Sequence, residues 1–222
     1  DTSGQRNLTI SGELDAATGD FSGAVDIAGA LTTSSTLVTT GTINTLGMTG
    51  PKTNFANSIL ISGDAGTGTL SSADGNTGVG AGVFAALTTG DNNVAVGLNS
   101  LAAHTTGNNN TAVGKDALND NTTAANNVAV GYESLSKNTT GTSLTAIGQL
   151  SLAANTTADN NTAVGRLALY ANTTGANNTS VGFSALCTNT TGATNVAVGC
   201  GALLINTTGA NNTALGAKAL CS

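Results

Sequence analysis

From Asn76 onward, apolar and polar residues follow a fixed order that returns every 17 residues. Counting Asn76 as position 1, the order is N-[TV]-A-V-G-x-x-A-L-x-x-N-T-T-G-x-N. The glycine at position 5 marks nine copies at equal intervals: Gly80, Gly97, Gly114, Gly131, Gly148, Gly165, Gly182, Gly199 and Gly216. Nine copies without an insertion or deletion predict a solenoid, in which each repeat forms one turn stacked on the next.

The apolar positions of the repeat suggest where its core lies. Position 4 is branched and apolar in every copy, and position 9 is Leu in every copy except Phe84. We therefore predict that both positions are buried. The T-A-V-G segment indicates one short strand, since β-branched residues suit a half-buried strand face, and x-x-A-L indicates a second. Position 3 is nearly always Ala, which predicts another backbone close by.

The remaining N-T-T-G-x-N segment has the composition of turns, because Gly and Asn accept positive φ and Asn bonds its own backbone. Stacked turns would also place Asn above Asn at position 1, from Asn76 to Asn212, interrupted only by Leu144. Such ladders pair side-chain amides between neighbouring turns.

A single repeat cannot fold alone. Two buried apolar side chains contribute roughly 3–6 kcal/mol, whereas ordering the backbone of one repeat costs on the order of 17–34 kcal/mol. Contacts between turns must supply the difference. At about 4.8 Å per turn, nine turns would form a rod of roughly 40 Å. Because the apolar strip is thin, further burial between chains is expected, and a homotrimer around one axis is favoured.

The chain divides into three segments by pattern. Residues 1–50 lack the 17-residue period and carry short alternating apolar segments broken by glycine, which predicts a slender β-shaft with strands paired between chains. Residues 51–75 are rich in Gly, Ser and Asp and are interpreted as an adaptor. Residues 76–222 form the nine-turn solenoid, whose last copy is incomplete. We expect the chain to be part of a longer one, since it starts without Met.

Composition excludes several other classes of protein. Aromatic residues make up 3% and charged residues 8% of the chain, so a wide globular core is not expected. Disorder is disfavoured because there is one proline and little charge. The net charge is −6 and the six cations are scattered, which argues against nucleic acid. No apolar segment reaches the ~20 residues that span a bilayer, and no signal peptide is visible.

No motif for catalysis or cofactor binding is present, so we predict that the protein is not an enzyme and has no cofactor. The glycine-rich segment from Gly75 to Gly82 resembles a phosphate loop, but it lies in register with the first repeat and lacks the following Lys-Ser/Thr. His104, the single histidine, is at position 12 and is interpreted as a polar turn residue. The alternative is a metal site that three copies form on a trimer axis.

The cysteine and asparagine patterns each allow a functional and a purely structural interpretation. Cys187 and Cys221 share position 10 two turns apart, roughly 9–10 Å by strand spacing, which exceeds the reach of a disulfide. With Cys200 at position 6, these thiols are expected to be free or paired between chains. The N-T-T triplets match the N-glycosylation pattern, although the repeat explains them as turns. They begin at Asn121, Asn138, Asn155, Asn172, Asn189 and Asn206.

Positions 6, 7, 10 and 11 vary most among the copies and hold most of the repeat's charged and aromatic residues. A solvated face explains this variation. A strip that contacts a receptor is the functional alternative, with Tyr132, Arg166, Tyr170 and Phe183 as candidate contacts and a tyrosine stacking on a sugar.

The N-[TV]-A-V-G-x-x-A-L-x-x-N-T-T-G repeat resembles repeats in tail fibres and other appendages of bacteriophages and large aquatic viruses. It is more distantly similar to the N-S-V-A-I-G-x-x-S repeat in the heads of YadA-like trimeric autotransporter adhesins. The L-T-I-S-G-E-L-D-A segment resembles phage fibre shafts. The resemblance implies an all-β fold, namely a left-handed parallel β-roll. It also implies that three chains intertwine as a homotrimer and that the homotrimer projects from a virion or cell surface. The repeat here is longer than the autotransporter repeat.

The expected function is that of an attachment segment of a trimeric virion tail fibre. Its partners would be copies of itself, other tail or baseplate proteins, and a glycan or protein receptor on the host surface. A bacterial surface adhesin and a pure spacer shaft are the alternatives. Ice binding, suggested by the Thr residues at positions 13 and 14, is disfavoured because adjacent residues of a strand point to opposite faces.

Overall fold

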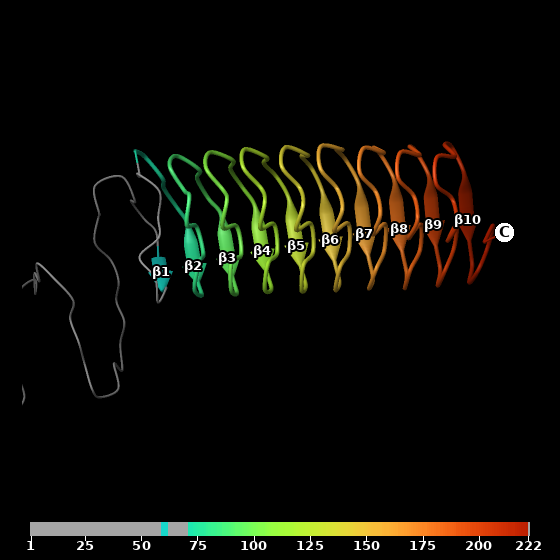
Figure 1. Ribbon diagram of the computed structural model, residues 1–222, viewed down its shortest axis with the longest axis horizontal. Helices are drawn as coiled ribbons and strands as arrows, with labels where there is room; N and C mark the ends of the chain where they lie inside the picture. Colours follow the sequence, from blue (N-terminus) through green and yellow to red (C-terminus); the bar gives the residue numbers. More distant parts are fainter. Residues whose placement is uncertain (1–58, 62–70, 222) are drawn as a thin grey trace, which may run out of the picture. The chain divides into compact units, whose positions relative to one another are not determined.

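The computed structural model describes residues 59–61 and 71–221, and these residues form a parallel β-solenoid. The predicted β-shaft, residues 1–50, and most of the predicted adaptor lie outside the described residues. Each turn contributes one strand of three residues to a ten-stranded sheet, whose strands follow the order of the chain from β1 to β10. Figure 1 shows the turns stacked side by side from β2 to β10.

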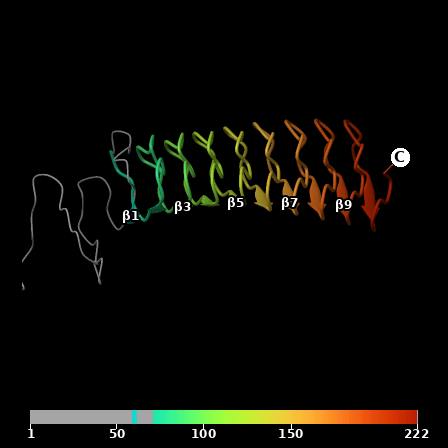
Figure 2. The same ribbon diagram turned by 60° about the horizontal axis from the view of Figure 1, so that its bottom comes forward.

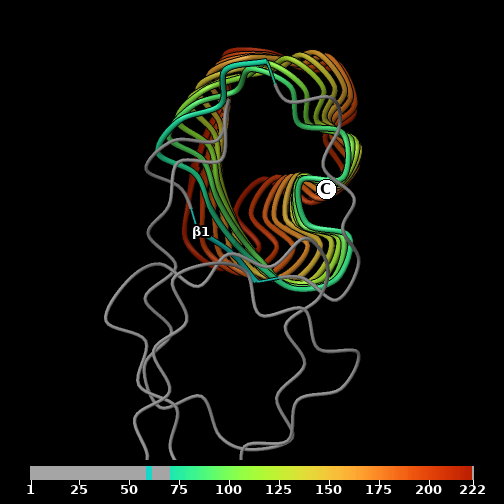
Figure 3. The same ribbon diagram turned by 90° about the vertical axis from the view of Figure 1, so that its left-hand side faces the viewer.

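The strands recur every 17 residues from β2 to β10, and β1 starts 18 residues before β2. They are β1 (Ile59–Ile61), β2 (Thr77–Val79), β3 (Val94–Val96), β4 (Thr111–Val113), β5 (Val128–Val130), β6 (Thr145–Ile147), β7 (Thr162–Val164), β8 (Thr179–Val181), β9 (Val196–Val198) and β10 (Thr213–Leu215). Every pairing is parallel and joins equivalent positions, as in Val94 with Thr111. Seen along the stack, successive turns lie over one another with a gradual offset (Figure 3). The sheet starts before the first full repeat, since β1 pairs with β2.

Each strand alternates its side chains between the interior and the outside. The position-3 residue is buried in every strand from β2 to β10, for example Ala112 and Ala129, which have no exposed surface. Positions 2 and 4 point outward and are half-buried or exposed. The prediction that position 4 is core is therefore wrong. Because side chains alternate along a strand, a buried position 3 forces both of its neighbours outward.

The interior is lined by small and medium side chains. Position 9 is buried from Phe84 to Leu203, as predicted, and packs with position 3 and with Ala or Ser at position 8. At Gly78, an added Cβ would contact the side chains of Leu60, Val83 and Phe84. Position 3 is thus small because core side chains occupy the space beside it, and not because of a nearby backbone.

The expected second strand over positions 6–9 is absent from the described residues. Positions 7 and 9 adopt positive φ instead, near 56° at Asp116 and 50° at Leu118, so this segment coils and does not extend. A left-handed conformation costs a leucine on the order of 1–2 kcal/mol. Burying its side chain contributes about 1.5–3 kcal/mol, which offsets this strain.

The glycine at position 5 is required by both conformation and space. Its φ is near +130° in successive turns, and a Cβ on Gly97 would lie 2.6 Å from the carbonyl oxygen of Gly114. No side chain fits between the turns at this bend. The strictly periodic glycine that reveals the repeat in the sequence is therefore a point where neighbouring backbones leave no room for a side chain.

Hydrogen bonds between turns hold the stack together. The predicted amide ladder at position 1 is confirmed, for example by Asn93 Nδ2, which donates to Asn76 Oδ1 at 3.1 Å. At the interruption, the backbone N–H of Leu144 still donates to Asn127 Oδ1 at 2.9 Å. Every buried side-chain nitrogen or oxygen of the described residues has a partner. A polar interior is thus compatible with a stable stack.

A second amide ladder, at position 12, is a finding that the sequence interpretation missed. Asn155 Nδ2 donates to Asn138 Oδ1 at 2.9 Å and also to the carbonyl oxygen of Ala158, three residues later, at 3.0 Å. The same two bonds recur along the column at Asn138, Asn172, Asn189 and Asn206. Position 12 is therefore an interior position, although N-T-T has the composition of an exposed turn.

Candidate interaction surfaces

The outward side of the sheet forms a continuous, uncharged and mostly apolar surface, which we call the strand face. It consists of the side chains at positions 2 and 4 of β2 to β10, and all of them are Thr, Val, Ile or Leu. Val79 is 38% exposed, Ile147 41% and Val196 38%. Figure 2 shows these strands in one row along one side of the stack. An uncharged apolar strip of this length is typical of a surface that another molecule covers.

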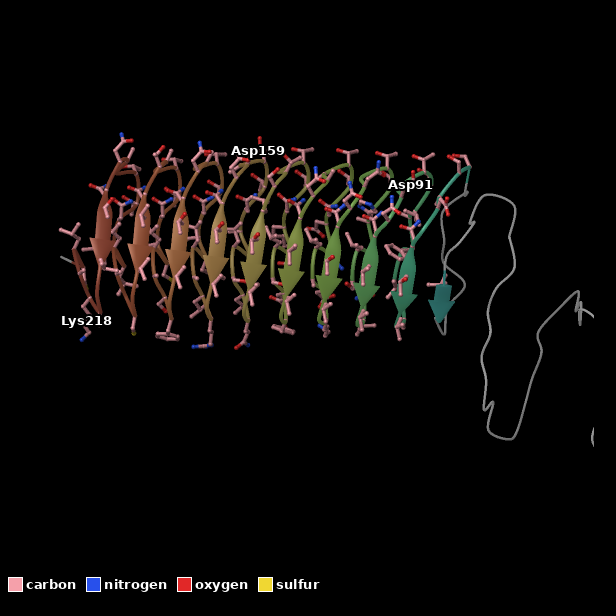
Figure 4. All side chains as sticks on the ribbon, turned by 180° about the vertical axis from the view of Figure 1, so that it is seen from behind. Asp91, Asp159 and Lys218 are labelled. Atoms are coloured by element: carbon pink, nitrogen blue, oxygen red, sulfur yellow. The ribbon has the colours of Figure 1, made fainter. Side chains whose placement is uncertain are left out.

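A second surface is built from the variable positions 6, 7, 10 and 11, which we call the variable ridge. Leu98, Lys115, Tyr132, Gln149, Arg166, Phe183 and Cys200 occupy position 6 in successive turns, and all are exposed. Figure 4 labels Lys218, at position 7, on the edge of the stack opposite to Asp91 and Asp159, at position 16. Positions 7 and 16 thus lie on opposite edges of the stack.

The structure brings three of the four predicted receptor contacts into one column. Tyr132, Arg166 and Phe183 share position 6, whereas Tyr170 is at position 10, farther along the coiled segment. Tyr132 is 41% exposed and Phe183 49%. Arg166 and Phe183 lie in consecutive turns, and the turn of Tyr132 comes two turns before that of Arg166. The parallel register therefore aligns the three along the stack.

Cations of the ridge lie over its aromatic rings. Lys115 Nζ is 5.2 Å from the centroid of the Tyr132 ring, and the Arg166 guanidinium carbon is 5.6 Å from that of Phe183. Arg166 Nε also donates to Gln149 Oε1 at 3.1 Å. Exposed contacts of this kind contribute about 0.5–1 kcal/mol each. They order the side chains along the ridge while leaving them accessible.

Ion pairs on the ridge link adjacent residues and adjacent turns. Within the part of the chain that the structure describes, Lys115 pairs with Asp116, and Lys137 Nζ lies 3.0 Å from Asp120 Oδ2. The hydrogen bond to Asp120 raises the pKa of Lys137. Both pairs are solvent-exposed, so each contributes little to stability. The ridge therefore tolerates substitution, which explains why its sequence varies from turn to turn.

His104 lies inside its own turn and has no exposed surface. Its Nε2 is 2.7 Å from the carbonyl oxygen of Gly107, and its Nδ1 is 2.9 Å from Asn121 Nδ2. It is therefore a buried member of the position-12 column, and the interpretation as a polar turn residue is incomplete. Both ring nitrogens have partners within one chain. Residues 59–61 and 71–221 contain no group of His, Cys, Asp and Glu side chains suited to a metal ion.

The three cysteines are free and differ in exposure. Cys187 is half-buried, and burial raises the pKa of its thiol, whereas Cys200 is exposed on the variable ridge. Cys187 and Cys221 are in alternate turns at position 10. This is consistent with the expectation that no disulfide joins them within one chain.

The N-T-T asparagines belong to the buried ladder. From Asn121 to Asn189 their side chains have no exposed surface, and each amide is bonded to the neighbouring turn. An oligosaccharide on these nitrogens would break the ladder. The folded solenoid therefore offers no accessible acceptor at these five asparagines, in agreement with their interpretation as structural residues.

The threonines at positions 13 and 14 have different roles. The hydroxyl at position 13 donates to a carbonyl oxygen of the next turn, as Thr105 Oγ1 does to Thr122 at 2.9 Å. Position 14 is exposed in all turns from Thr106 to Thr208. Only one of the two columns therefore presents free side chains, so these residues do not form a flat face of two threonine columns.

Comparison of the chain with family models, with curated proteins and with solved structures gave no match. What the fold and the surfaces define is a class of architecture: an all-β, parallel β-solenoid with 17-residue turns and two distinct outward surfaces. The described residues include no helix that is long and apolar enough to cross a membrane.

Proposed function

We propose that this chain is a structural and attachment segment of a homotrimeric fibre, of the kind that virion tail fibres use to reach a host surface. The observation that carries the proposal is the strand face, an apolar strip without a charged residue that continues through every turn from β2 to β10. In the proposed assembly three solenoids pack these faces around one axis. The left-handed winding and the intertwining of the chains are part of the proposal.

The energetics of the strand face support association between chains. Covering the exposed part of one outward valine, such as Val79 at 38%, would contribute on the order of 0.5–1 kcal/mol. Nine position-4 side chains would then contribute on the order of 5–10 kcal/mol per chain. This is comparable with the cost of association, about 4–15 kcal/mol. The outward Thr and Val residues at position 2 would add to the favourable side.

The variable ridge is the surface that we assign to the host. It lies outside the strand face, so assembly leaves it accessible, and it carries the exposed Tyr132, Arg166 and Phe183. A glycan or protein receptor would contact these side chains, and tail or baseplate proteins would bind other parts of the fibre. The proposal places the protein on a virion or an extracellular surface and assigns it no catalytic activity.

A pure spacer is the second candidate, and one observation favours it. Lys115 and Arg166 already lie over aromatic rings of their own chain, so these ridge side chains have partners without a receptor. In that case the receptor site lies elsewhere in the fibre. A bacterial trimeric adhesin would use the same solenoid and the same strand face, and it differs in the particle that carries it.

Cross-linking between chains tests which surface mediates assembly. In a background with Cys187, Cys200 and Cys221 replaced by Ser, Thr162→Cys places a thiol on the strand face, and Thr157→Cys places one on the exposed position-14 column. A short bismaleimide should join chains of the Thr162→Cys variant and leave Thr157→Cys chains separate. Equal coupling in both variants, or coupling of Thr157→Cys alone, would contradict the assignment.

A further inference from the structure

The position-12 amide ladder has a defined end at His104. In the turn before it, the same position is Leu87, which is fully buried and has no polar atom to offer. In the turn after it, Asn121 starts the run of asparagines that continues to Asn206. His104 is therefore the place where the buried column changes from apolar to polar, and the ladder depends on what its ring presents.

The neutral imidazole reproduces the bonding pattern of an asparagine. Each ladder asparagine donates to the carbonyl oxygen three residues later, and the carbonyl oxygen of Gly107 occupies this place beside His104 Nε2 at 2.7 Å. A carbonyl only accepts, so Nε2 carries the proton. Nδ1 is then the acceptor for Asn121 Nδ2 at 2.9 Å, in the way that each Oδ1 accepts from the next turn.

Protonation would remove this acceptor. An Nδ1–H would face the Nδ2 of Asn121, so two donors would meet where a donor and an acceptor now lie 2.9 Å apart. Rotation of the Asn121 amide does not solve the conflict, because its Oδ1 already accepts from Asn138 Nδ2 at 3.2 Å and its Nδ2 points to the carbonyl of Ala124 at 3.3 Å. A reversed amide would break both bonds, and the same conflict would pass to each following turn.

The surroundings of the ring offer no compensating charge. The neighbouring turns contribute Leu87 and Gly90 on one side and Asn121 and Ala124 on the other, and none of these titrates. An added Cβ on Gly90 would lie 3.0 Å from His104 Nε2, so the packing is close. Burial lowers the pKa of His104 below its ordinary value, with smaller opposing effects from the bonds to Gly107 and Asn121.

We propose that His104 is an acid-sensitive closure of the solenoid, whose protonation releases the end of the amide ladder and opens the turns around residues 87–124. The inference is independent of assembly and attachment. Because the folded-state pKa of His104 is lowered, the stability that its neutral ring contributes to the ladder is fully present above the unfolded-state pKa, near 6.5. It is lost as pH falls through the folded-state pKa.

Amide hydrogen exchange of the full chain between pH 7 and pH 4, corrected for the intrinsic pH dependence of exchange, tests the proposal. In the parent, exchange in peptides covering residues 87–124 should accelerate by up to about tenfold per pH unit between the unfolded-state pKa, near 6.5, and the lower folded-state pKa, and should level off below it. His104→Asn is the matched control, since it keeps the ladder and all carboxylates but does not titrate. Its exchange in these peptides should be nearly independent of pH.

A second variant separates the loss of the acceptor from the gain of a proton. His104→Leu removes the acceptor of Asn121 at every pH, so these peptides should exchange faster than in the parent already at pH 7, without further acceleration in acid. The proposal is overturned if the parent and His104→Asn show the same pH dependence in these peptides. It is also overturned if the acceleration in the parent is confined to turns beyond residue 124.

Discussion

Two apolar columns of this solenoid have nearly the same composition and opposite surroundings. Position 9 is Leu in eight of nine copies and is buried from Phe84 to Leu203, whereas position 4 is Val, Ile or Leu and points outward in every turn. Leu135 packs inside its own chain, while Val130, five residues earlier, lies on the strand face. Apolar character alone therefore does not mark burial within one chain, and the alternation of side chains along the strand decides which apolar residue points inward.

The largest effect is expected inside the chain. Leu135→Asp places an unpaired charge in a fully buried column, which should cost more than about 4 kcal/mol and prevent the solenoid from folding. Far-UV circular dichroism and thermal unfolding measure this directly. Leu135→Met is the control, because a swap that conserves volume costs less than about 1.5 kcal/mol. A Leu135→Asp chain that melts like the parent would show that position 9 is not core.

The same contrast between inside and outside should hold for polar residues, with a smaller loss of unfolding free energy. Asn138→Ala removes the Oδ1 acceptor of Asn155 Nδ2 and the amide that donates to Asn121 Oδ1. The expected loss is about 1–3 kcal/mol of unfolding free energy. Thr140→Ala, at exposed position 14 in the same turn, should stay within about 0.5 kcal/mol. Urea unfolding of both variants compares them, and equal losses would mean that the buried ladder contributes nothing specific.

The variable ridge should show the smallest effect on stability. Replacing Tyr132, Arg166, Tyr170 and Phe183 together by Ala removes exposed side chains and two cation–π contacts, so the unfolding free energy should fall by less than about 2 kcal/mol. The mass of the assembly in solution, measured by sedimentation, should not change. Binding to cells that the parent recognises should drop markedly. Unchanged binding would leave the segment as a spacer and place the receptor site elsewhere.

Much of this architecture could be predicted from the sequence, because the repeat constrains it strongly. The glycine at position 5 identifies the turn, and the position-1 asparagines predict their own ladder once turns are stacked. The direction of position 4 was predicted wrongly, although the information was present. In T-A-V, a buried Ala places Val on the opposite face, whereas the apolar pattern alone favours Val as core and the small Ala as a sign of nearby backbone.

Other features had no clear signal in the sequence. Leucine rarely adopts positive φ, so the coiled segment with Leu118 at φ 50° could not be foreseen from composition. Asn-Thr-Thr is equally typical of an exposed turn and of a buried ladder. Only the structure shows that Asn138 faces inward while Thr140 faces outward, and that His104 is the polar end of that ladder.

The central claim is that the strand face joins chains while the interior folds each one, and sedimentation of the parent beside Val130→Asp tests it most directly. At micromolar concentration the parent should sediment as three chains. Val130→Asp places a charge on the strand face and leaves the interior intact, so it should sediment as one chain with the circular dichroism of a folded solenoid. A parent that sediments as a stable, folded single chain would contradict the account, as would a Val130→Asp variant that is as unfolded as Leu135→Asp.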